Sequence, residues 1–450
     1  MNQELWNRIL NFNFDFPQSE FGFTTRLAKE NYWTLNFTKK AILEYKKFMY
    51  LAATSNVMVS PSEIVDVVWH QHLIFTKSYQ KFCTILGKQI QHIPSTHNKE
   101  DYAKFKQAKE QTKILYEQNF GNQPEEIWSF NTMFESLKLK KAKYKLRTFI
   151  NFGIISFVCL ILPFYFILNP IYRKIDGSLF IFLLLILSIV IFSILEIYNR
   201  KKLHELIINI DKKSFLFDLI PDELIYLKKQ NIINVINVSI NELIKENVIK
   251  ISDNKQVFLN EKAIVNTPES YQIVALIPEN KSISYIDLIT KLKYKPIFSN
   301  ISNSLDATTK FINKSQKFHT LYYTNFVIIS TLILLAFVRI ITGLVHSKNI
   351  GVILVSTIFL IMFSVFFLDR LTKQIAVNQL PKFYINEIIS KEKIENHSEW
   401  NYFLLGSSAL IWTFKPIAED LQTEKNQNNS CSSCGTSCGS CGGCSGCGSS

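Results

Sequence analysis

Cysteine is scarce in the body of this 450-residue chain, and no complete catalytic signature occurs along it. Of its 8 cysteines, Cys83 and Cys159 are the two that precede a C-terminal cysteine run. The missing signature leaves any reaction open. The N-terminus lacks an early apolar stretch, so we expect no cleaved signal peptide. No arginine-rich recognition helix stands out, and acidic residues interleave with the lysines, so we expect no nucleic-acid partner.

The tail has no apolar residues of its own, so it cannot fold around a core, and we expect residues 426–450 to be disordered. It is rich in Ser and Gly and carries Cys431, Cys434, Cys438, Cys441, Cys444 and Cys447. Spacings of two or three residues let neighbouring thiolates reach one soft ion, so the run is a candidate zinc site. Thiol modification or a plain tether are alternatives.

Long apolar segments are abundant, as a chain that is 47% hydrophobic with 36 Phe would have. Four of them, at 148–168, 178–198, 323–343 and 350–368, approach the roughly 20 residues that cross a bilayer. They predict two transmembrane hairpins. Arg339 lies near one end, and we expect it to snorkel to the interface. Because the spans carry almost no charge, a transporter with a polar path is disfavoured.

Cations beside these segments predict an orientation. They gather before the first span and after the second, at Lys138, Lys140, Lys141, Lys143, Lys145, Arg147, Arg200, Lys201 and Lys202. The short outer loops carry few lysines or arginines. We therefore expect both termini and residues 199–321 to be cytoplasmic, in an inner or cytoplasmic membrane. Anionic lipid headgroups then account for much of the net charge of +13.

The region before the first span has helical patterning. In one helix, apolar residues recur at steps of three and four from Ala41 to Met49. Another is predicted to start with Ser60 as its N-cap, Pro61 at its first position and Glu63 completing a capping box.

That second helix carries the densest polar and aromatic cluster: Asp66, Trp69, His70 and His72, with His92 further on. Asp66 and His70 stand one turn apart, whereas His70 and His72 point to nearly opposite sides. One interpretation is structural: an Asp66 to His70 hydrogen bond with Trp69 in the core. The other is a metal or acid/base site of Asp66, His70 and a returning histidine, His92 or His97.

The same region resembles the N-terminal domain of glycine-rich domain-containing proteins, known in plants and bacteria. The resemblance rests on residues in a fixed order: Glu44, Tyr45, Phe48, Pro61, Ser62, Asp66, Trp69, His70, His72, Tyr79, Cys83, His92, Pro94, Phe120, Gly121, Pro124 and Trp128. It implies an α-helical domain without an assigned activity. The segment STHNKED departs from the family pattern after its His-Pro.

Between the hairpins, residues 215–260 predict helix, helix and then a hairpin that turns at Asp253 and Asn254, a winged-helix-like unit. Residues 271–313 predict a loose repeat of it. Segment 402–412 is too short to span and is predicted to pack against the membrane face. LFDLIPDELIYLKK, with the spans and tail, resembles uncharacterised bacterial membrane proteins with a Gly- or Cys-rich C-terminus.

The sequence thus predicts a mainly α protein in six parts: a helical domain (1–135), hairpins (148–198 and 323–368) around an α+β domain (199–321), a membrane-proximal segment (369–425) and the tail (426–450). Three functions fit these features. The favoured one is a membrane-anchored scaffold that meets protein partners and presents the thiol tail. The others are a metal-dependent enzyme using Asp66, His70 and His92, and a carrier of a modified cysteine peptide.

Overall fold

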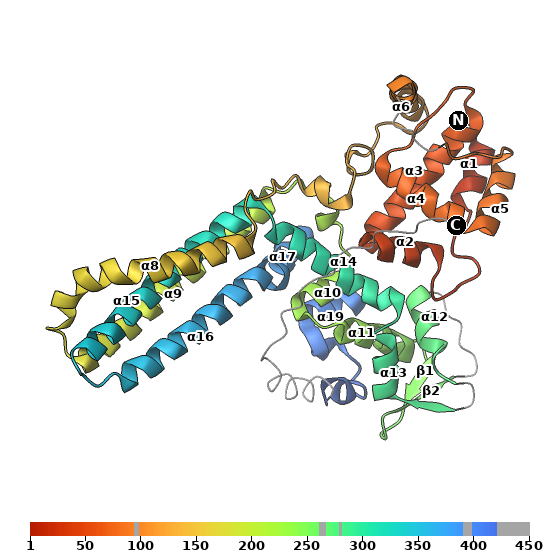
Figure 1. Ribbon diagram of the computed structural model, residues 1–450. Helices are drawn as coiled ribbons and strands as arrows, with labels where there is room; N and C mark the ends of the chain where they lie inside the picture. Colours follow the sequence, from red (N-terminus) through yellow and green to blue (C-terminus); the bar gives the residue numbers. More distant parts are fainter. Residues whose placement is uncertain (94–98, 261–266, 279–280, 390–397, 421–450) are drawn as a thin grey trace, which may run out of the picture.

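The computed structural model describes residues 1–93, 99–260, 267–278, 281–389 and 398–420 (Figure 1). His97 and the six tail cysteines lie outside these ranges. The described chain is mainly α-helical with one three-stranded antiparallel sheet, which confirms the predicted class. It forms a helical bundle, with the other helices and the sheet gathered at one end of that bundle, called the domain end below (Figure 1).

The bundle consists of α8 (Leu146–Tyr172), α9 (Gly177–Ile208), α15 (Gln316–Val345) and α16 (Gly351–Gln374). All four are long and apolar enough to cross a membrane. Helix α15 packs on the other three, and large apolar side chains elsewhere on the bundle, such as Phe152, Ile197 and Phe359, are exposed. Such an apolar outer surface suits hydrocarbon rather than water. The prediction of four candidate spans is confirmed by length and composition.

Arg339 was predicted to snorkel to the membrane interface, but its side chain turns into the bundle instead. Its side chain is only 6% exposed, and its guanidinium donates to the backbone carbonyls of Tyr172 and Ile175. These carbonyls lie at the C-terminal end of α8 and in the turn after it, where helical partners run out. The guanidinium also lies over the ring of Phe180. Arg339 therefore links the α8–α9 turn to α15. Backbone carbonyls inside the bundle accept the hydrogen bonds that water or lipid headgroups would otherwise accept.

The N-terminal unit contains α1 (Gln3–Leu10), α2 (Phe23–Asn31), α3 (Leu35–Thr54), α4 (Glu63–Ile74), α5 (Thr76–Leu86), α6 (Lys99–Phe120) and α7 (Glu125–Trp128). Glu44 joins three of them, since its carboxylate accepts from the Tyr116 hydroxyl of α6 and the Trp128 indole of α7. The predicted N-cap of α4 is wrong by two residues. Ser62 caps it by accepting from Val65 N, while Ser60 N donates to Thr112 Oγ1.

The middle unit contains α10 (Pro221–Lys229), α11 (Ile232–Lys245), β1 (Ile249–Ile251), β2 (Gln256–Leu259), α12 (Pro268–Val274), β3 (Ser282–Ser284), α13 (Tyr285–Leu292) and α14 (Pro296–Asn313). The two helices and the hairpin occur as predicted. Helices also occur in the predicted loose repeat, but its described residues have no sheet of their own, because β3 pairs with β2 in the order β1-β2-β3. Residues 215–313 thus form one unit.

The C-terminal part packs on this middle unit. Helix α16 continues through π-helical and α-helical turns to Ile388, where the Tyr384 hydroxyl donates to Leu216 O. In α19 (Ser398–Leu405), the Tyr402 hydroxyl donates to Asn234 Oδ1 of α11. Segment 402–412 packs on α10 and α11, which supply its polar partners.

The N-terminal and middle units contact each other directly. Helix α14 packs on α2, and at the start of α3 the Leu35 N–H donates to Glu223 Oε1 over 3.0 Å. An ion pair of 2.6 Å joins Lys295 to Glu20. Residues far apart in sequence therefore form one interface at the domain end of the bundle.

Candidate metal centre

Helix α4 presents two side chains of the centre on one exposed face. Asp66 lies in its first turn and His70 one turn later, so both project in nearly the same direction. His92 comes from the extended segment after α5. The third side chain, His92, therefore lies 22 residues after His70 in the sequence.

The three side chains converge closely. His92 Nε2 lies 2.9 Å from Asp66 Oδ1 and 3.0 Å from His70 Nε2. His70 Nε2 is 3.8 Å from Asp66 Oδ2. All three possible ligand atoms lie within 4.8 Å of one another, and this group of His, Cys, Asp or Glu is the one such cluster among the described residues.

Protons alone do not satisfy this geometry well. A ring nitrogen carries either one N–H or one lone pair, so His92 Nε2 cannot donate to Asp66 and accept from His70 at once. A single N–H shared between both neighbours makes two weakened bonds. Three lone pairs directed at one ion would satisfy all the groups together. Ligands about 2.1 Å from a metal lie about 3.0 Å apart at the right angles of an octahedral site and about 3.4 Å apart at tetrahedral angles, so separations of 2.9, 3.0 and 3.8 Å need only small shifts to surround one ion.

One side of the cluster faces solvent. The exposed fraction is 58% for the His70 side chain, 31% for Asp66 and 17% for His92. Three protein ligands with an open side are typical of zinc sites that retain a water, and two histidines with one carboxylate are also typical of non-haem Fe(II) sites.

An internal network fixes the segment that carries His92. The Trp69 indole N–H donates to the Tyr79 hydroxyl over 3.2 Å, and that hydroxyl donates to the carbonyl of Ile90. Helix α5 ends at Gly87 in the left-handed conformation (φ 71°), which glycine adopts without strain and which turns the chain back toward α4. The ring of Trp69 also packs edge-on against His92, with ring centroids 4.6 Å apart.

His72 belongs to the core. It is fully buried, its Nδ1 lies 2.9 Å from the Tyr45 hydroxyl and its Nε2 lies 3.2 Å from Ser78 Oγ. Burial lowers the pKa of His72 from 6.5 to about 3, so the ring is neutral at physiological pH. The prediction that His70 and His72 point to opposite sides is confirmed.

The structural interpretation of the cluster is correct in one part and wrong in another. Trp69 is buried, as predicted. The predicted hydrogen bond between Asp66 and His70 is absent, because their closest ring nitrogen and carboxylate oxygen are 3.8 Å apart and Asp66 pairs with His92. Sequence reasoning gave Tyr79 no role. Tyr79 lies ten residues after Trp69, close enough in sequence for the two side chains to meet. Only the fold reveals that Tyr79 contacts Ile90.

Comparison with known proteins concerns this part of the chain. Residues 13–119 match the model of an uncharacterised family described as UCP032817-like. No curated protein and no solved structure matches the chain. The matched range contains Asp66, His70 and His92, together with the Trp69 and Tyr79 that position them. The N-terminal helical unit is therefore similar to the UCP032817-like family over about a quarter of the full sequence.

Proposed function

We propose that this chain is a membrane-anchored protein whose N-terminal unit binds one divalent transition-metal ion through Asp66, His70 and His92. The observation that carries the proposal is the convergence of three lone-pair donors in a geometry that one proton on His92 cannot satisfy. Zinc is the first candidate and Fe(II) the second.

Such a centre can support chemistry because its outer side is open. The exposed His70 leaves room for water or a substrate group beside the ion. A zinc ion with three protein ligands lowers the pKa of bound water toward about 7, which would supply a hydrolytic nucleophile. We therefore infer a metal-assisted hydrolytic function as the catalytic form of the proposal.

The experiment is a metal titration of the full chain in detergent micelles. The cysteines are first alkylated, so that the tail thiols cannot bind, and bound metal is removed with a chelator. We expect Zn²⁺ to bind one to one and Co²⁺ to give visible d–d bands without thiolate charge-transfer bands. His70→Ala, His92→Ala and Asp66→Asn should each weaken binding by more than the 10- to 100-fold typical of losing an outer partner.

The matched control is His204→Ala, which removes an exposed histidine at the end of α9. It should bind as the unaltered chain does. Equal zinc affinity in His204→Ala and His70→Ala would refute the centre. Because His70 is exposed, its loss should leave the unfolding temperature nearly unchanged, which separates ligation from folding.

The scaffold function remains a second proposal, and the position of the last described residue supports it. Asp420, the last described residue, pairs with Lys255 of the β1–β2 hairpin over 3.0 Å. The described chain thus ends at the domain end of the bundle, beside surfaces that partners could reach. Intact-mass spectrometry of the native protein tests it. We expect unmodified thiols, whereas a mass shift confined to residues 431–450 would favour the modified-carrier function instead.

A further inference from the structure

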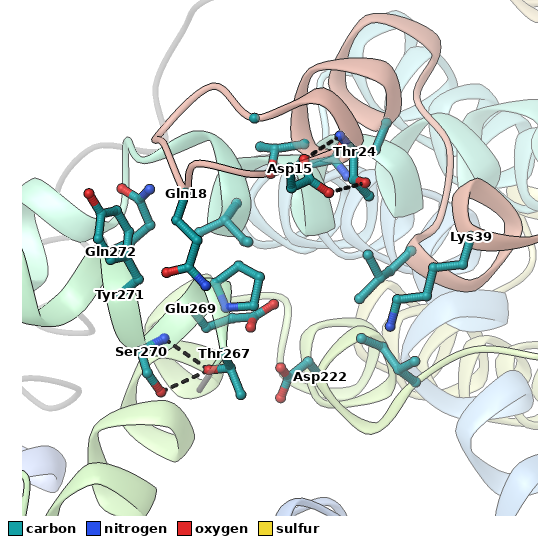
Figure 2. A pocket seen from close by; sticks show the side chains of 18 of the residues that line it. Asp15, Gln18, Thr24, Lys39, Asp222, Thr267, Glu269, Ser270, Tyr271 and Gln272 are labelled. Atoms are coloured by element: carbon teal, nitrogen blue, oxygen red, sulfur yellow. Dashed lines mark hydrogen bonds between the residues drawn. The ribbon is translucent and has the colours of Figure 1, made fainter. Parts of the chain in front are cut away.

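A cavity of about 850 Å³ lies where the N-terminal unit meets the middle unit (Figure 2). Its walls come from the segment before α2 and from α2, α3, α10, α11, α12, α14 and α19. None of the three metal-centre residues lines it. The cavity is therefore a separate feature, formed at the interface between the N-terminal and middle units.

The lining is strongly acidic although the chain is basic. Carboxylates outnumber lysines among the lining residues by seven to two, in a chain with a net charge of +13. One of those lysines, Lys46, already donates to the backbone carbonyls of Leu10 and Phe12. Burial, followed by the nearby carboxylates of Glu399 and Glu269, raises the pKa of Asp222 well above its ordinary value.

Two buried oxygen atoms in the lining are acceptors without a donor. Asp222 Oδ1 and Asn300 Oδ1 have no hydrogen-bond partner among the described residues, and each residue is 8% exposed. Leaving a buried acceptor unsatisfied costs roughly 1 to 3 kcal/mol. In the close-up, Asp222 lies near Glu269, and the ammonium end of Lys39 points toward them from across the cavity (Figure 2). Both oxygens are closed off from solvent, so rotation of either side chain toward the cavity would let a ligand with donor groups satisfy them.

The size and spread of the site select the class of ligand. A volume of about 850 Å³ lies in the range of small-molecule sites and far exceeds one ion. The acidic side chains come from different elements, such as α10, α12 and α19, and within the described chain they do not converge in threes as metal ligands do. Apolar residues, including Phe14, Ile220 and Ile301, separate them.

We propose that this cavity binds a small organic cation with two or more ammonium groups on an aliphatic chain, chemically a polyamine. Its ammonium groups donate to Asp222 and Asn300 and pair with neighbouring carboxylates, while its methylene groups lie against the apolar wall. Because both units build the cavity, binding holds the N-terminal unit on the middle unit.

Spermidine is the probe. It is titrated into the full chain in detergent micelles by calorimetry, and the unfolding temperature is followed in parallel. A chelator is present throughout, so the result does not depend on the metal centre. We expect spermidine to bind and to raise the unfolding temperature with concentration. A bound ammonium group favours the ionised form of Asp222, and Asp222→Asn removes that charge, so it should lower the affinity about tenfold or more.

The control variant is Asp253→Asn, which neutralises an exposed carboxylate in the β1–β2 turn. It should bind spermidine as the unaltered chain does. Without spermidine, Asp222→Asn should unfold at the same temperature or higher, since it removes a buried carboxyl. No binding, or equal affinity in the two variants, overturns the proposal. Mg²⁺, titrated separately after the chelator is removed, would also overturn the organic-cation assignment if it acted through Asp222 as effectively as spermidine.

Discussion

Neutral His72 should make the N-terminal unit sensitive to acid in a way that one substitution removes. The ring is fully buried among aromatic side chains, with Phe14 and Phe82 at centroid distances of 4.8 and 5.5 Å. Burial lowers its pKa to about 3 in the folded chain, whereas the unfolded chain binds the same proton near pH 6.5. The unfolded state therefore gains protons first as the pH falls, and stability decreases below about pH 6.5.

The magnitude follows from that displacement of the pKa. Each pH unit below 6.5 costs about 1.36 kcal/mol until the folded ring titrates near pH 3. Between pH 7.5 and 5.0 the loss attributable to His72 is about 2 kcal/mol. Other acidic groups titrate as well, so the informative quantity is the difference between the unaltered chain and His72→Gln. Glutamine can accept from Tyr45 but does not titrate.

Hydrogen exchange of the full chain in detergent micelles measures this difference. Peptides covering α4 and α5 report the free energy of opening at each pH, after correction for intrinsic exchange rates. We expect His72→Gln to start less stable at pH 7.5, because one buried hydrogen bond is remodelled, and to lose about 2 kcal/mol less by pH 5.0. Parallel curves for the two proteins would refute the assignment of a neutral buried ring to His72.

Three further predictions concern the core and the membrane region. Trp69→Ala should lower the free energy of unfolding by roughly 3 to 5 kcal/mol, measured by denaturant titration, and a change under 1 kcal/mol would contradict its burial. Asn199 and Asn325 are buried and hydrogen-bonded to each other between α9 and α15, so Asn325→Leu should destabilise the bundle by roughly 1 kcal/mol in micelles. Asn199→Leu in the same chain should recover part of that loss; additive losses would argue against the pairing. Cysteine probes at Ser178 or Ser347 should be labelled from outside intact cells and probes near Gln3 or Ser437 should not, and labelling of Ser437 would reverse the proposed orientation.

Local chemistry made much of the architecture predictable. Apolar runs of the right length identified the four candidate spans, because crossing hydrocarbon requires about 20 apolar residues whatever surrounds them. Helical periodicity likewise placed His70 and His72 on opposite sides of one helix. Both inferences depend on features that neighbouring residues in the chain decide.

Contacts between distant segments decided what the sequence could not. His92, and not His70, is the hydrogen-bond partner of Asp66, because Tyr79 anchors the returning segment at Ile90. Arg339 is buried because the open carbonyls of the α8–α9 turn lie beside it. Proximity on one helix had suggested His70 as the partner of Asp66. Nearness to the end of a span had suggested the membrane interface as the environment of Arg339.

The acidic cavity shows the same limit most clearly. Its carboxylates are scattered from Asp15 to Glu399 and form no motif in the sequence. They meet because α2 packs on α14 and α19 packs on α10, which no local pattern specifies. The sequence by itself determined which segments are helices, which of them are apolar enough to span a membrane, and which helix carries Asp66 and His70. The tertiary structure alone decided which charged groups share one cavity, since electrostatic and hydrogen-bond energies depend on distance in space and not along the chain.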